Sequence, residues 1–214
     1  MTAASRAPHV VAKPWATRAL YVLWRFVACL LVLSLLAYWH GADLTDRLLP
    51  AFRAEINWLD DTYRIDRLLV DTDGADQVVR IVVGLNRCVV LPDGAHCADP
   101  RGLASAATLV GHVTLPAILM LAIVLSWPVN AWREWIGRLL LWPASLALLW
   151  ALDVPLTLWG LLWRLHVDAF VPGLFSPLLV WGQFLEGGGR MVLAVALASL
   201  VIGIPAFVGR SARP

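Results

Sequence analysis

Two ionisable side chains, a carboxylate and an imidazole, each interrupt a stretch of sequence that is otherwise apolar. Asp153 lies within LLWALDVPLTLWGLLWRLHVD, residues 148–168, and His112 lies near the start of the apolar run 109–127. Ionisable residues inside a membrane usually face a partner, a cavity or the interior of a helix bundle, because an unpaired polar group is costly in a low dielectric. We therefore predict a hydrogen bond between His112 and Asp153. The alternative is that one of them contacts a second protein or a ligand.

A further polar group, Arg164, His166 and Asp168, lies at the end of the same apolar stretch. Its cationic groups could receive a lipid headgroup or an acidic peptide terminus at the membrane surface. The simpler interpretation is the solvated end of a helix. The three side chains are retained as candidates for a contact on the outer face.

The segment CVVLPDGAHC holds Cys88 and Cys97, whereas Cys29 lies in an apolar run and is expected only to fill space. If this segment faces an oxidising compartment, Cys88 and Cys97 are predicted to form a disulfide, and closing so short a loop contributes about 2.5–3 kcal/mol in the simple chain-entropy model. A metal site combining both thiols with His96 would lack a fourth ligand nearby. We therefore expect no metal.

Sequence patterns typical of enzymes are missing. The chain holds no GxSxG, HExxH, Walker A or dinucleotide-binding glycine pattern. The segment EGGGR at 186–190 is interpreted as a flexible entry to a membrane helix rather than as a phosphate site. A Cys–His–Arg site would need an outward-facing thiol, and both candidate thiols are assigned to the disulfide. We predict no catalytic residue and no cofactor.

The composition is that of a membrane protein. Hydrophobic residues make up 60% of the chain and charged residues 15%, with a mean hydropathy of +0.73, whereas soluble proteins carry about 25% charged residues. The formal net charge of +2 offers no basic excess that would attract nucleic acid.

Four apolar runs are long enough to cross roughly 30 Å of hydrocarbon as helices, which takes about 20 residues. We predict four transmembrane helices: Leu20–Trp39, Leu109–Trp127, Leu139–Leu158 and Met191–Val208. The first run is too long for the apolar core of a signal peptide, and no small-x-small cleavage site follows it, so we expect it to remain as an anchor. Pro116 and Pro155 should kink the second and third helices, where either irregular packing or a shallow outward-facing groove would result.

Short basic segments set the predicted orientation, because Lys and Arg in such segments favour the cytoplasm. They lie before or early in the first run, between the second and third, and after the fourth: Arg6, Lys13, Arg18, Arg25, Arg133, Arg138, Arg210 and Arg213. Both termini are therefore expected in the cytoplasm of a bacterial-type inner membrane. The predicted parts are a cytoplasmic tail, the first transmembrane helix, an extracytoplasmic α+β domain, the remaining three transmembrane helices and a second cytoplasmic tail: 1–19, 20–39, 40–106, 107–208 and 209–214.

The extracytoplasmic domain is expected to combine a helix with a β-meander. Apolar residues recur at helical spacing over 44–59 with an interruption at Pro50, which predicts an amphipathic helix that is broken or restarted there. Three antiparallel strands should follow, with the central one covered on both faces: 64–70, 77–85 and 88–91.

The apolar stretch between Arg164 and Arg190 is punctuated by Pro172-Gly173 and Pro177, so that its uninterrupted part is too short to span the membrane. A fifth crossing would also place the basic C-terminus outside. We predict an interfacial or re-entrant segment over 164–190, with its apolar core at 169–184.

One membrane helix is followed by a small outer β-domain, then by ATLVGHVTLPAILMLAIVLSWP, residues 107–128, and then by a helix flanked by Trp and Arg. This layout of the chain resembles that of the small membrane proteins associated with type-H exosortases. The resemblance lies in the layout of most of the chain. It implies a bacterial inner-membrane accessory to an exosortase, the enzyme that processes proteins bearing a C-terminal sorting signal. The catalytic Cys, Arg and His of that system would belong to the exosortase, and no residue here is carried over as catalytic.

We therefore predict a mainly helical, non-enzymatic membrane protein whose outer domain and outer-leaflet groove engage membrane lipid and another integral membrane protein. A small transport or channel subunit, with His112 and Asp153 as a relay, is the alternative. It is disfavoured because no second intramembrane carboxylate continues the path. An enzyme acting on a lipid-linked substrate is disfavoured by the missing nucleophile.

Overall fold

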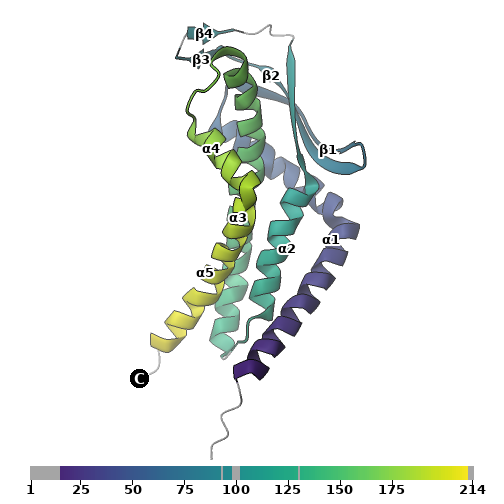
Figure 1. The fold of residues 1–214 in the computed structure, drawn as a ribbon, viewed down its shortest axis with the longest axis vertical. Helices are drawn as coiled ribbons and strands as arrows, with labels where there is room; N and C mark the ends of the chain where they lie inside the picture. The colour runs from purple at the N-terminus through teal and green to yellow at the C-terminus, as the bar shows by residue number, and fades with distance from the viewer. Residues whose placement is uncertain (1–14, 93, 98–101, 130, 212–214) are drawn as a thin grey trace, which may run out of the picture.

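The computed structural model describes residues 15–92, 94–97, 102–129 and 131–211, and it shows an elongated helical body with a small sheet at one end (Figure 1). The start of α1 and the end of α5 both lie toward the end of the molecule opposite the sheet. The outermost parts of both predicted tails lie outside the described residues, as does Asp93 of the predicted Pro92-Asp93-Gly94 turn.

Helices form most of the structure: α1 (Trp15–Leu59), α2 (Val110–Ser126), α3 (Trp132–Phe170), α4 (Pro177–Phe184), the short π-helical segment η1 (Leu185–Gly189) and α5 (Arg190–Ser211). Three stretches of the described chain are long and apolar enough to cross a membrane: Thr17–Leu59, Trp132–Phe170 and Pro177–Phe207. The apolar helix α2 is shorter, at 17 residues. A helix suits a lipid environment because it satisfies its own backbone hydrogen bonds.

The first helix does not break at Pro50, so the predicted interruption is wrong. The anchor and the amphipathic segment form one continuous helix of 45 residues. Leu49, Phe52 and Ile56 are buried on either side of the proline and pack in the core beneath the sheet. This packing holds the adjacent turns in helical geometry, although proline removes a backbone donor.

The segment 164–190, predicted to be interfacial or re-entrant, is helical apart from a short connection at 171–176, and its position relative to a membrane stays a prediction. Helix α3 continues to Phe170, a short turn with Gly173 at φ 89° reverses the chain, and α4 then runs back along α3 (Figure 1). Helix α4 joins α5 through η1. The predicted fourth membrane helix is therefore the continuation of this returning arm.

The main sheet is antiparallel with the strand order β1-β2-β5, formed by Tyr63–Asp73, Asp76–Leu85 and Leu103–Leu109. The predicted hairpin between the first two strands is confirmed, with Gly74 at φ 63° in its turn. The predicted third strand is present as β3 (Val89–Leu91), but its predicted place in the meander is wrong, because it pairs with β4 (Gly94–His96) in a separate hairpin. Strand β5, which the sequence analysis placed partly in the second membrane helix, takes that position and leads directly into α2.

The sheet rests on the helices through one fully buried face. Val79, Ile81 and Val83 of β2 are at most 1% exposed and pack against α1 and against Val154 and Leu158 of α3. On the other face, Arg80 remains partly accessible, so the prediction that both faces are covered is only half right. The core joins the sheet to the bundle, which fixes the position of the outer half of α3.

Candidate functional site

The buried carboxylate Asp153 pairs with Arg190, not with His112. Arg190 Nε donates to Asp153 Oδ1 at 2.7 Å, and the two side chains are 7% and 2% exposed. His112 instead forms a 2.8 Å hydrogen bond through Nδ1 with the Thr108 hydroxyl. The predicted contact between His112 and Asp153 is therefore wrong. Similar depths along α2 and α3 do not determine how the two helices are rotated, and Arg190 at the start of α5 faces the carboxylate instead.

Further hydrogen bonds complete the environment of the ion pair. Arg190 Nη2 donates to the Thr157 hydroxyl at 3.3 Å, Thr157 donates to Asp153 Oδ1 at 3.4 Å, and Arg190 Nη1 donates to the Leu185 carbonyl at 3.3 Å. Asp153 Oδ2 is buried without a hydrogen-bond partner among the described residues. The arrangement joins α3 to the start of α5.

A kink between α4 and α5 places Arg190 beside Asp153. Gly188 has a φ of 102°, a conformation that other residues rarely adopt, and it lies in the π-helical segment η1. A Cβ atom on Gly189 would lie only 2.5 Å from the Phe184 carbonyl oxygen, so this position also requires glycine. The EGGGR segment is thus a defined kink between α4 and α5 rather than a flexible entry.

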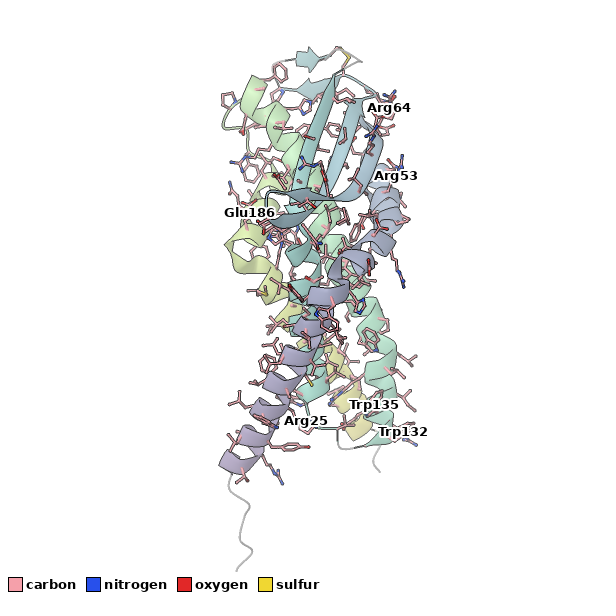
Figure 2. The ribbon with its side chains drawn as sticks, turned by 90° about the vertical axis from the view of Figure 1, so that its right-hand side faces the viewer. Arg25, Arg53, Arg64, Trp132, Trp135 and Glu186 are labelled. Atoms are coloured by element: carbon pink, nitrogen blue, oxygen red, sulfur yellow. A yellow bond between two sulfur atoms is a disulfide. The ribbon has the colours of Figure 1, made fainter. Side chains whose placement is uncertain are left out.

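Above the ion pair, a cavity of about 260 Å³ opens between α3 and α4; we call it the outer pocket. Thr157, which bonds the ion pair, lies in its lining. The polar side chains around it come from both helices and the turn between them: Thr157, Arg164, Asp168, Ser176, Gln183 and Glu186. Arg164 and Asp168 form an exposed ion pair at 3.5 Å. Glu186 is exposed and has no hydrogen bond or ion pair to a described residue (Figure 2).

The predicted outer-face group is split by the structure. Arg164 and Asp168 line the outer pocket, but His166 faces the sheet, where its Nδ1 lies 3.1 Å from the Tyr63 hydroxyl and 3.0 Å from the Leu162 carbonyl oxygen. Burial, and secondarily the charge of Asp60, raise the pKa of Tyr63 well above its usual range. The phenol therefore stays neutral, and its hydroxyl shares a hydrogen bond with His166 Nδ1.

A second bond fastens the sheet to α3. Trp159 Nε1 donates to Asp60 Oδ2 at 3.0 Å, about two turns before His166 on the same helix. Trp159 and His166 thus tie α3 to the segment that begins the sheet, whereas Arg164 and Asp168 line the outer pocket on the side of α4 and also a cavity between α3 and β5.

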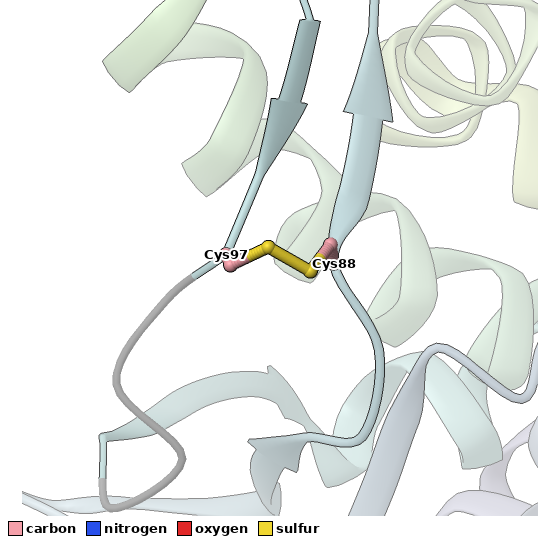
Figure 3. Close-up of a disulfide and its surroundings, with 2 residues drawn as sticks. All are labelled: Cys88 and Cys97. Carbon is pink, nitrogen blue, oxygen red and sulfur yellow. A yellow bond between two sulfur atoms is a disulfide. The ribbon is translucent and has the colours of Figure 1, made fainter.

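The predicted disulfide between Cys88 and Cys97 is present, with a Cα–Cα separation of 4.3 Å (Figure 3). It closes the β3–β4 hairpin at the sheet end of the molecule. The described residues contain no cluster of three or more His, Cys, Asp or Glu side chains that could hold a metal ion.

A larger, mostly apolar groove of about 670 Å³ runs between α1, α2 and α3. Its walls include Ile118 and Leu146, and its rim near the sheet carries His40, Asp43 and Arg47. This groove runs beside Pro143 and along the part of α2 that flanks Pro116, where Thr114 and Ala117 line it, but it does not include Pro155.

Comparison of the chain with protein-family models, with curated proteins and with solved structures finds no match.

Proposed function

We propose that this chain is a non-enzymatic accessory protein of a bacterial-type inner membrane, which engages another integral membrane protein through the outer pocket. An exosortase is the favoured partner, on the layout of one anchor helix, an outer β-domain and a Trp- and Arg-flanked bundle. The observation that carries the proposal is the outer pocket itself. It is a cavity that combines charged and polar side chains with apolar ones, and it is built on helices that continue beyond the length that a bilayer requires.

The length of α3 supports an extramembrane position for this pocket. Its 39 residues give a helix of about 58 Å, roughly twice the hydrocarbon thickness. Arg164 and Asp168 lie in its last two turns, beside a sheet that cannot expose its edges to lipid. The pocket would therefore face water just above the headgroups, within reach of a membrane-bound partner.

The proposed topology has four crossings, through α1, α2, α3 and the α4–α5 arm, with both termini in the cytoplasm. Arg25, Trp132 and Trp135 lie at the end of the molecule opposite the sheet (Figure 2), as expected for the cytoplasmic interface. The disulfide at the other end suits an oxidising compartment. Arg6, Lys13 and Arg213, which contribute to the predicted orientation, lie outside the described residues.

Charge defines the kind of partner segment that fits. Among the described lining residues the pocket holds two carboxylates, Asp168 and Glu186, and one guanidinium, Arg164, which already pairs with Asp168. Glu186 is therefore available to a basic side chain, while Gln183 and Ser176 offer neutral hydrogen bonds. A short extramembrane segment with a basic residue is the complementary ligand. The apolar groove between α1, α2 and α3 would accept a helix of the same partner.

The test is affinity purification of the tagged full-length protein from its native membranes in a mild detergent, with mass spectrometry of what is recovered. Glu186→Gln should reduce recovery of the partner by about tenfold, because it removes the contact with the basic side chain, and Asp168→Asn should reduce recovery similarly, because it leaves the Arg164 charge unpaired to repel a basic segment. Asp66→Asn is the matched control, since it also loses an exposed pair with an arginine, Arg64, but lies on β1. Equal recovery from all variants, or recovery of the protein alone from the parent, would refute the proposal.

A further inference from the structure

A second cavity with charged walls lies at the end of the molecule opposite the sheet. It has a volume of about 410 Å³ and lies between α1, the end of α2 and the start of α3. Three tryptophans line it, Trp127, Trp135 and Trp142, together with aliphatic side chains. The charged residues of its described lining are both arginines, Arg25 and Arg138. We call it the inner pocket.

The two arginines are held in place by the backbone at the end of α2. Arg138 is only 6% exposed, and its Nη1 and Nη2 donate to the carbonyls of Trp127 and Pro128 at 2.9 and 3.1 Å. Arg25 Nη2 donates to the Leu125 carbonyl at 3.0 Å. These carbonyls carry only partial negative charge at a helix C-terminus, so two full positive charges face one cavity.

The guanidinium of Arg138 is not fully satisfied by these contacts. Its Nε is buried without a hydrogen-bond partner among the described residues. Glu134, one turn earlier in α3, lies near enough to act on Arg138 electrostatically but is not part of the cavity lining. A buried cation with a spare donor is costly unless an anion completes its environment.

We propose that the inner pocket binds the phosphate headgroup of an anionic phospholipid from the adjacent leaflet. Guanidinium groups recognise phosphate oxygens through paired N–H donors, and Trp side chains are favoured at headgroup level. Basic pockets between transmembrane helices on the cytoplasmic side are suited to such headgroups. This site is separate from the outer pocket, so its test is independent of partner binding.

The experiment uses the purified full-length chain in a neutral detergent and measures the midpoint of thermal unfolding against lipid concentration. Dioctanoyl phosphatidylglycerol should raise the midpoint, whereas dioctanoyl phosphatidylcholine and inorganic phosphate should not. Arg25→Gln and Arg138→Gln should each weaken the apparent affinity for phosphatidylglycerol at least about tenfold. Arg133→Gln is the control, because it removes an exposed positive charge from the same end of α3 without altering the cavity lining.

Every outcome of this experiment either supports or overturns the proposed phospholipid site. Selective stabilisation by phosphatidylglycerol that is lost in the arginine variants and kept in Arg133→Gln supports the site. Equal stabilisation by phosphatidylcholine, an equal effect of inorganic phosphate, or equal weakening by Arg133→Gln would overturn it. If Arg138→Gln does not fold, Arg25→Gln still tests the lipid site. Arg25 is only half-buried, and its hydrogen bond to the Leu125 carbonyl comes from its side chain, so we expect this variant to fold.

Discussion

Arg190 Nε donates a 2.7 Å hydrogen bond to Asp153 Oδ1, so that two charges far apart in the sequence meet inside the apolar bundle. Such a pair is weak evidence for stability in itself, because desolvation of both charges offsets their attraction. Its position matters more. It fixes the register of α5 against α3 directly below the outer pocket, and Thr157 contacts both the pair and the pocket.

Removing one member of this pair should be far more harmful than removing both. Asp153→Leu leaves Arg190 buried and unpaired, and Arg190→Met leaves Asp153 in the same state; we expect each to cost about 3–5 kcal/mol in the free energy of unfolding. Asp153→Leu combined with Arg190→Met should recover most of that loss. Unfolding curves of the parent, both single variants and the double variant in one detergent measure the coupling. Additive losses in the double variant would show that the two charges act independently.

The backbone conformation of Gly188 predicts that an alanine there destabilises the fold, and the neighbouring Gly187 offers a matched control. Gly188→Ala must place a Cβ at a φ of 102°, which should destabilise the fold by about 1–3 kcal/mol. Gly187 has neither a positive φ nor a neighbour within 4 Å of an added Cβ. Gly187→Ala should therefore be neutral or slightly stabilising in the same thermal unfolding assay. Equal effects of both variants would exclude conformational strain as the cause.

The Tyr63 phenol should resist ionisation. Because burial raises its pKa in the folded state, the stability that the neutral phenol contributes is complete below its ordinary pKa and is lost only as the pH rises through the raised value. Tyr63→Phe should therefore leave the near-ultraviolet phenolate absorbance unchanged near pH 10, about the ordinary phenol pKa. A fall in that absorbance relative to the parent would mean that Tyr63 ionises normally.

The disulfide predicts both a labelling pattern and a stability change. Cys88 and Cys97 should react with a membrane-impermeant thiol reagent only after reduction, whereas Cys29, inside α1, should stay unlabelled in intact cells. Replacing Cys88 and Cys97 with serine should lower stability by about 2.5–3 kcal/mol through the lost loop constraint. Labelling without reductant would contradict the pairing under native conditions.

Reporter fusions test the proposed topology directly. Fusions after residues 100, 130, 170 and 214 should report outside, inside, outside and inside, because α2, α3 and the α4–α5 arm each cross once. An outward reporter at the C-terminus would overturn the count of four crossings. The fusion after residue 170 is the most informative, since it falls in the turn between α3 and α4.

Much of the helical framework follows from local sequence. Run length predicts the apolar helices, and the Asp73-Gly74 turn predicts the first hairpin, because both signals depend on neighbouring residues. Strand β5 was missed because its sequence, LASAATL, is rich in small residues and lacks the large β-branched side chains that mark strands. The continuity of α1 through Pro50 depends on packing against the sheet, which no local signal reports.

The candidate site was less accessible to sequence reasoning. Asp153 stands out because it is a charge within an apolar run, but its partner depends on helix rotation and on the kink at Gly188. The signal that could have found the pair is Arg190, a lone cation at the start of the last apolar run, directly after three glycines. Likewise, periodicity alone does not show that His166 turns toward Tyr63 while Arg164 turns toward α4.

The central claim, that the outer pocket holds a membrane partner, is tested most directly by site-specific photo-crosslinking from Gln183, an exposed residue of its lining. A photoreactive amino acid at this position in native membranes should give one discrete adduct with another integral membrane protein. The same probe at Trp58, exposed on the far end of α1, should not. Adducts with lipid alone, or identical adducts from both positions, would contradict the account.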